Sequence, residues 1–270
     1  MLSDGVIKIL EQFDVHPDFG FVYPDPLVRL PEKFVPWHEI IGKCTGILPF
    51  FSLILLPELL EKGLLEDRIQ KLPLIAADTL RIDKELRLAH LLLATLAAGH
   101  IWQYGPNKVQ MSIPVNISSP LLDVSNRLGL KPIVCHASVC LANWKPLRNT
   151  PTFNAEHVDI IASRFLRHPA NRWFFTLTAQ IETELAPALC AIASACYHRK
   201  IEETTMQDIR NSLSKATHSI EASVHKLQLF KTNCCRLSAT SPYLCTRHTF
   251  DVCFNEFVSQ IFSQILHDFT

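Results

Sequence analysis

The chain has 270 residues, of which 48% are hydrophobic and 19% charged, a composition that is typical of a folded globular protein and excludes a disordered one. Its 26 basic residues balance its 26 acidic residues, so the overall charge gives no reason to expect binding to nucleic acid or to an anionic membrane. Nine cysteines without regular spacing, and a first segment without the pattern of a secretory signal, indicate a reducing compartment, and we expect a cytoplasmic protein.

The first part of the chain predicts short helices around an extended segment. Apolar residues at helical spacing favour a helix over residues 6–13. Three prolines exclude a helix from residues 20–34, so we expect an extended crossing there. The helical pattern then returns, with an apolar insertion at about residues 44–55 and helices predicted over residues 37–43, 57–62 and 64–72.

Residues 84–104 predict a long helix with leucines on nearly every face. No Lys, Arg, Asp or Glu occurs from residue 88 to residue 107, a length that would just cross a bilayer. The same stretch contains His90 and Gln103, and its flanks show no bias of positive charge. We therefore expect a buried core helix and no membrane span.

Prolines at both ends of residues 114–120 indicate an extended linker, and we place a domain boundary near residue 115. After the segment PIVCHASVCLANW at residues 132–144, a turn is predicted over residues 145–154. The fold class is all-α, because no alternation of strands and helices occurs. Further helices are predicted over residues 121–128, 155–165, 173–197 and 206–230.

The predicted helix over residues 173–197 carries one apolar stripe at three- and four-residue steps, which includes Leu177, Ile181 and Leu185. Such a stripe needs other helices to cover it. Where they do not, we expect the chain to associate through exposed apolar helix faces.

Six segments stand out by their amino-acid sequences and by their order along the chain. They are GFVYPDP at residues 20–26, LPELLEKGLLEDRIQKLPL at 56–74, LRLAHLLLATLAAGHIW at 86–102, IPVNISSPLLDVSNRLGLKPIV at 113–134, LANWKP at 141–146 and RWFFTLTAQIETELAPAL at 172–189. In this colinear order, over residues 20–228, the chain resembles the indoleamine 2,3-dioxygenase family. No single segment carries the resemblance.

The resemblance implies a small helical N-terminal domain, residues 1–115, and the first part of a larger helical haem domain, residues 116–230. Residues 231–270 are a tail unlike the family. The cofactor that the resemblance implies is b-type haem, and the implied reaction uses O₂ to open the indole ring of tryptophan to N-formylkynurenine, the first step of the kynurenine pathway. The family also includes myoglobin-like oxygen carriers, and the sequence leaves that branch open.

The resemblance also implies a distal pocket. Phe174 stands where the family has an aromatic residue that stacks on the substrate indole, and Thr178 where it has a small hydroxyl beside bound O₂. These residues are four apart on a predicted helix and so share a face. His136, Val139 and Cys140 fall on the segment that lines the indole-binding end. For Phe174 and His136, packing in a core is the alternative interpretation.

The family pattern is followed to about residue 230. The later family segments supply an arginine for the substrate carboxylate, a glycine- and serine-rich loop over the haem, and the proximal histidine, and we find no counterpart for them. His218, His225 and His248 lack the glycine-rich context of a proximal ligand. We therefore assign no metal ligand and no certain catalytic residue. The second hypothesis is a truncated, non-catalytic family member that acts only by interaction.

Other site chemistries have less support. Glu182 and Glu184 lie two residues apart on a helix and cannot form an acid–base pair. Cys135 and His136 are adjacent, and in an extended chain they would point in opposite directions, which excludes a nucleophile and its base. A zinc site in the tail is disfavoured by the spacing of Cys234, Cys235, Cys245, His248 and Cys253.

Overall fold

The computed structural model describes residues 2–42, 55–105, 107–147, 153–165, 169–198 and 205–238, and for residues 225–238 the backbone alone. The expected apolar insertion and most of the expected tail lie outside these ranges. The chain divides into two compact units. We call Val22–Gln180 the central unit, and Met1–Phe21 with Ile181–Thr270 the terminal unit. The domain division near residue 115 stays a prediction.

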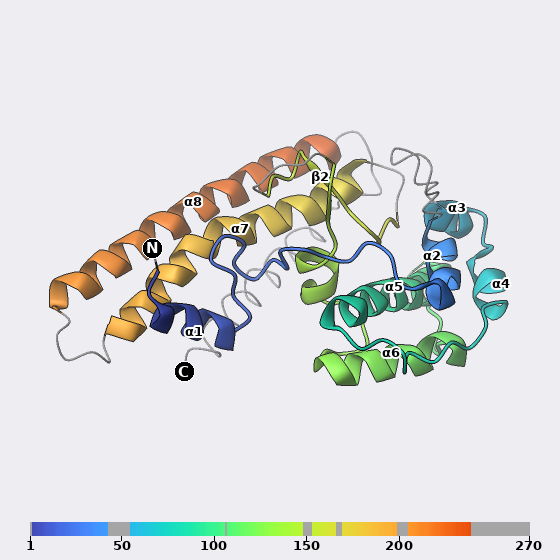
Figure 1. Ribbon diagram of the computed structural model, residues 1–270. Coiled ribbons are helices and arrows are strands. Elements are labelled where there is room, and N and C mark those ends of the chain that lie inside the picture. The colour runs from blue at the N-terminus through green and yellow to red at the C-terminus, as the bar shows by residue number, and fades with distance from the viewer. Residues whose placement is uncertain are drawn as a thin grey trace. The chain divides into compact units, whose positions relative to one another are not determined.

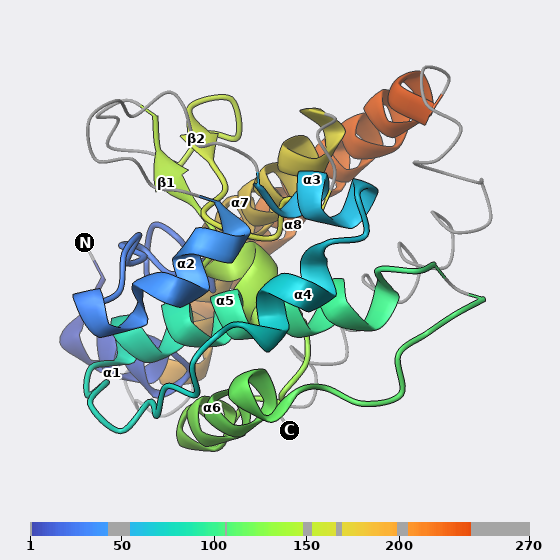
Figure 2. The same cartoon turned by 90° about the vertical axis from the view of Figure 1, so that its right-hand side faces the viewer.

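The central unit is built around α5 (Asp83–Trp102), which is buried along most of its length. As Figures 1 and 2 show, α6 (Val115–Leu128) packs along α5, and α2 (Val35–Ile41) and α4 (Leu65–Gln70) pack against it from other sides. α3 (Leu55–Glu61) joins α2 and α4. The leucines of α5 point in all directions because α5 has neighbours in all directions, as its sequence predicts.

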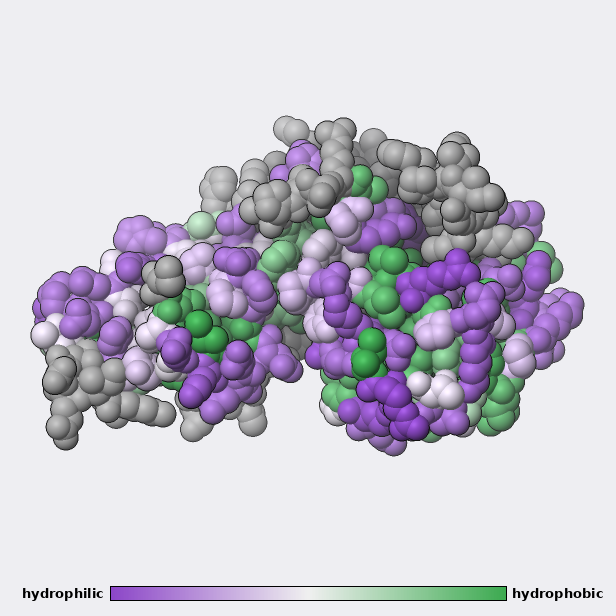
Figure 3. Space-filling view, in the orientation of Figure 1, coloured by the Kyte–Doolittle hydropathy of each residue, from purple (hydrophilic) through white to green (hydrophobic). Residues whose placement is uncertain are grey.

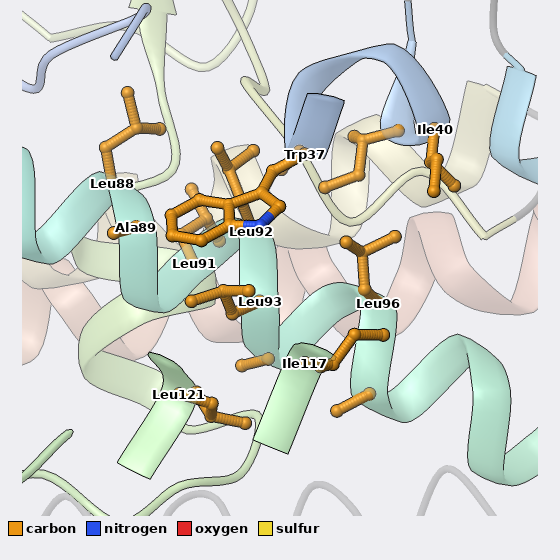
Figure 4. Packing of buried hydrophobic residues seen from close by; sticks show 14 of the residues in the cluster. Trp37, Ile40, Leu88, Ala89, Leu91, Leu92, Leu93, Leu96, Ile117 and Leu121 are labelled. Atoms are coloured by element: carbon orange, nitrogen blue, oxygen red, sulfur yellow. The ribbon is translucent and has the colours of Figure 1, made fainter. Parts of the chain in front are cut away.

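Trp37 of α2 fills the middle of this packing. Its indole is completely buried against α5, in the hydrophobic cluster that also contains Leu91, Leu92 and Leu93 (Figure 4). The ring of Phe34, from the short 3₁₀ turn η1 (Glu32–Phe34), lies 4.9 Å from it between centroids. No helix in the described ranges is both long and apolar enough to cross a membrane. The buried helix predicted from the leucine-rich sequence is confirmed.

The extended linker expected over residues 114–120 is wrong, because these residues begin α6. Pro114 lies just before the first helical residue, where a missing N–H removes no bond, and Pro120 lies inside the helix. Ile117 and Leu121 are fully buried in the core of the central unit. Burial of this face outweighs the single backbone hydrogen bond that Pro120 removes.

The helix expected over residues 155–165 is also wrong. β2 (Val158–Asp159) pairs antiparallel with β1 (Lys145–Pro146), a small hairpin that Figure 2 shows, and an irregular buried segment follows β2. Ser163, in that segment, has a positive φ of 64°, which a helix does not allow. The described structure is otherwise helical, and the all-α fold class is confirmed.

The terminal unit pairs α1 (Asp4–Gln12) and α8 (Met206–Ser238) with the later part of α7 (Pro169–His198). Val6 and Leu10 of α1 pack on Leu189 and Ala193 of α7. α8 runs beside α7, and Ser219 donates to the carbonyl of Glu184 at 2.7 Å. Figure 3 shows hydrophobic residues at the surface of this unit beside α1. α8 continues eight residues past its predicted end at residue 230.

Candidate functional site

The first turns of α7 carry the predicted aromatic residue and hydroxyl. Phe174 is 39% exposed, although it opens an apolar stripe, whereas Thr178 is buried. The Thr178 hydroxyl donates to the carbonyl of Phe174 at 2.7 Å, so its hydrogen is committed and its oxygen can only accept from a ligand. The ring of Phe175 meets that of Phe174 edge to face, with 5.2 Å between centroids. We call these turns, which carry Phe174 and Thr178, the second wall, because they follow in the chain the first wall that is defined below.

Two of the other predicted residues, Val139 and Cys140, lie buried on a single π-helical turn, η2 (Ala137–Leu141), and His136 directly precedes it. His136 is half-buried and has helical φ and ψ, so the extended chain assumed there is wrong for His136. The Cys135 sulfur instead lies 3.5 Å from the Ser138 hydroxyl. π turns are rare and recur at functional sites, because they displace side chains from the regular helical face. We call η2 the first wall.

Both walls contribute residues to one hydrophobic cluster. Val139 and Cys140 belong to the core around α5, and Phe175 packs on the same core. Between the walls in sequence runs the irregular segment of residues 160–165, which we call the connecting segment. Asn143, just after the first wall, and Asn171, at the start of the second, both hydrogen-bond to its backbone. The structure thus brings the predicted pocket residues into one unit.

The second wall is also tied to the hairpin by Arg172. Its guanidinium donates to the carbonyls of Val158, Ala155 and Glu156 at 3.0 to 3.1 Å and lies 3.8 Å from the carboxylate of Asp159. A guanidinium suits this role because its planar fork presents several donors at once. The orientation of α7 at Phe174 therefore depends on the hairpin.

The first wall is held from its other side by Tyr23, in the GFVYPDP segment. The Tyr23 amide donates to the carbonyl of Leu141 at 2.9 Å, and the indole of Trp144 donates to the Tyr23 carbonyl at 3.0 Å. The guanidinium of Arg87 lies over the tyrosine ring, 4.9 Å from its centroid. Burial raises the pKa of the Tyr23 phenol, and the Asp83 carboxylate raises it further. Two of the sequence segments singled out above, GFVYPDP and LANWKP, meet here.

The buried histidines of the central unit serve the backbone. His38 accepts from the amide of Leu30 at 3.1 Å, and its burial, with the charge of Arg29, lowers its pKa to about 4. His90 and His100 donate to backbone carbonyls at 3.0 and 3.1 Å. Burial lowers the pKa of His90. These histidines belong to α2 and α5, which carry none of the predicted pocket residues.

Within the described ranges, no three His, Cys, Asp or Glu side chains come together as a metal site requires. The terminal unit has an open groove of about 590 Å³ between α7 and α8, lined by Pro187, Lys215, His218 and Ser219 among others. The predicted pocket residues all belong to the central unit, so the groove is a separate feature.

Much of the apolar stripe on α7 is buried within the chain. Leu177 and Ile181 are covered, and Phe174 is the large apolar residue that stays exposed on the described part of that helix. Association through this face stays a prediction. Sequence reasoning missed Asn143 and Asn171, although Asn143 lies within the LANWKP segment, where a polar residue among apolar neighbours was the available signal.

Comparison with known proteins places these features in a family. The sequence model of "Indoleamine 2,3-dioxygenase" matches residues 9–237, which is most of the chain and extends past residue 230, where the resemblance was expected to end. Indoleamine 2,3-dioxygenase 1 of Mus musculus is 33% identical over 230 residues, which cover 85% of this chain and 52% of that protein.

More distant relatives match the chain as well. Indoleamine 2,3-dioxygenase 2 of Homo sapiens is 32% identical over 69% of this chain and 42% of its own length. A myoglobin of Haliotis madaka is 33% identical over 50% of this chain and 33% of its own length. The chain spans about half the length of Indoleamine 2,3-dioxygenase 1 of Mus musculus.

Proposed function

The chain belongs to the indoleamine 2,3-dioxygenase family, and from this premise we propose that its two walls bind the indole ring of tryptophan in a haem-dependent dioxygenase that opens this ring to N-formylkynurenine. The observation that carries the proposal is the pairing of an exposed phenyl ring, Phe174, with a buried hydroxyl one turn later, Thr178. A flat aromatic ligand can stack on the first and meet the second on the same helix face.

Each residue has a definite part in this proposal. The Phe174 ring offers a face for stacking, and the Phe175 ring, set edge-on against it, limits its rotation. Thr178 can accept a hydrogen bond from a ligand N–H, but to donate it must release the Phe174 carbonyl. Buried Val139 and Cys140 would exclude water from the other side.

Phe174 and Thr178 would hold the ligand beside a bound haem, and the haem iron would supply the activation of O₂. His38, His90 and His100 each bond to backbone and lie outside both walls, so we assign none of these buried histidines as an axial ligand. The second candidate function is a non-catalytic family member that acts by interaction. A cytoplasmic location stays a prediction.

Binding of free indole tests the proposed pocket without haem. Saturation-transfer NMR of the purified chain with indole should show transfer to the ring protons, and Phe174→Ala should abolish it. Tyr104→Ala is the matched control, because Tyr104 has the same exposed fraction, 39%, on a different surface of the central unit. If Phe174→Ala and Tyr104→Ala retain equal transfer, the indole is not bound at Phe174 and the proposal fails.

A further inference from the structure

We propose that Asn143 and Asn171 are positioning residues that hold the first and second walls at a fixed spacing and thereby set the room left for the proposed indole ligand. The inference rests on the function proposed above, since it concerns the same pocket. Neither residue is among the pocket residues that the sequence predicts. Their part is to fix the connecting segment, through which each wall is attached to the other.

Asn143 uses every hydrogen-bonding position of its amide. Its NH₂ group donates to the carbonyls of Val139 and Ala162 at 3.0 and 3.1 Å, and its oxygen accepts from the amides of Ile161 and Ala162 at 3.0 and 2.8 Å. The side chain is 1% exposed, so water does not compete for these bonds. A single side chain therefore joins the π turn to the connecting segment.

Asn171 hydrogen-bonds in a similar way to the later part of the connecting segment. Its NH₂ group donates to the carbonyl of Ser163 at 3.0 Å, and its oxygen accepts from the amide of Phe165 at 3.1 Å. It precedes Thr178 by seven residues, two helical turns, and so lies on the same face of α7. The second wall is thus fixed to the connecting segment on the face that carries the Thr178 hydroxyl.

The connecting segment can transmit spacing because it is itself anchored. Ser163 is completely buried in the left-handed region, with φ 64°, and its hydroxyl is 2.8 Å from that of Thr95 on α5. A serine persists in this conformation only where its surroundings hold it. Contacts therefore run from the first wall through Asn143, the connecting segment and Asn171 to the second wall. The core helix α5 holds the connecting segment in place.

The thiol of Cys140 reports on this arrangement, because it lies on the first wall and is buried. Alkylation of Cys140 by a maleimide, followed by mass spectrometry of the labelled peptide, should be about tenfold faster in Asn143→Ser, since a fully bonded buried amide is lost and the wall opens locally. In Asn171→Ser the same thiol should also react faster, although Asn171 is attached to the opposite wall.

Asn116→Ser provides the matched control. Asn116 is a buried asparagine of the same unit whose NH₂ group donates to the carbonyls of Ile69 and Leu72 at 2.7 and 2.9 Å, outside both walls. Its loss should lower global stability and leave Cys140 protected. If the three variants expose Cys140 equally, the asparagines are only general stabilisers. If Asn171→Ser leaves the rate of Cys140 alkylation unchanged, the walls are not coupled. Either result overturns the inference.

Selectivity between ligands of different size tests the spacing of the two walls. The ratio of the affinities for indole and for the bulkier 5-bromoindole should fall by about threefold or more in Asn143→Ser and stay constant in Asn116→Ser. An unchanged ratio in Asn143→Ser overturns the inference while the proposed function stands. Failure of the unaltered chain to bind indole contradicts the proposed function instead, and the Cys140 rates then decide the inference alone.

Discussion

Acidification should weaken the fold through His38, whose neutral imidazole is the form that the structure uses. The ring nitrogen accepts from the Leu30 amide and is surrounded by the core, and a proton on it would replace this acceptor by a second donor beside the positive charge of Arg29. The pKa of His38 is lowered from its ordinary value of 6.5 to about 4 in the folded chain, with burial as the main cause.

The direction of the effect follows from proton binding. Between pH 6.5 and about 4 the unfolded chain takes up a proton on His38 that the folded chain does not. The stability that neutral His38 supports is therefore complete above pH 6.5 and is lost as the pH falls, by about 3 kcal/mol at most by pH 4. Below that value both states are protonated and the loss levels off.

Urea unfolding at a series of pH values, followed by tryptophan fluorescence, measures this loss. In His38→Gln the amide oxygen can still accept from Leu30, and the titrating group is absent, so the free energy of unfolding should fall less steeply over this range. The lowered pKa of His90 acts in both proteins alike and cancels in the comparison. Parallel curves for the two proteins would refute the role given to His38.

Substitutions at Trp37, Gly20 and Arg172 test the packing. Trp37→Ala should destabilise the chain by about 3–5 kcal/mol, because its ring is fully buried, whereas Trp102→Ala, 57% exposed, should change stability by less than about 0.5 kcal/mol in the same urea titration. Gly20→Ala should cost more than about 1 kcal/mol, since φ is +61° and a Cβ would lie 2.9 Å from the carbonyl oxygen of Glu182; calorimetry would show a lower Tm, and an unchanged Tm would contradict this close approach of Gly20 to α7. Arg172→Ala should lose about 2 kcal/mol with its three carbonyl contacts, and Arg172→Lys should not restore them, as thermal unfolding of both would show.

Hydrophobic periodicity predicts helices correctly where tertiary packing does not override it. The leucine pattern of α5 predicts a helix surrounded by others, and the structure agrees. Gly129 directly follows the helix predicted over residues 121–128, and it ends α6 with φ 67° in the left-handed region that glycine favours. Local signals of this kind are readable from a single sequence.

Two segments were mispredicted for opposite reasons. The sequence predicts that Pro114 and Pro120 prevent a helix, yet tertiary burial of Ile117 and Leu121 carries the helix through the second proline. At residues 155–165 apolar residues are spaced as in a helix, but Asn143 takes the amides of Ile161 and Ala162, so helical bonds cannot form there. No local pattern reveals a partner eighteen residues away.

The candidate site was found through resemblance rather than through chemistry. A phenylalanine pair at the start of a helix normally indicates core, and only the structure shows that Phe174 is exposed while its neighbour Phe175 packs inward. The π turn of η2 could not be predicted either, because its sequence has no signature that separates it from an ordinary helical turn.

The most direct test of the proposed activity is the ultraviolet–visible spectrum of the purified chain titrated with haem. The proposal predicts a sharp Soret band that shifts with CO, shifts again when L-tryptophan is added, and loses the tryptophan response in Phe174→Ala. A spectrum identical to that of free haem, unaltered by tryptophan, would contradict haem-dependent dioxygenase activity in this chain and leave the non-catalytic candidate.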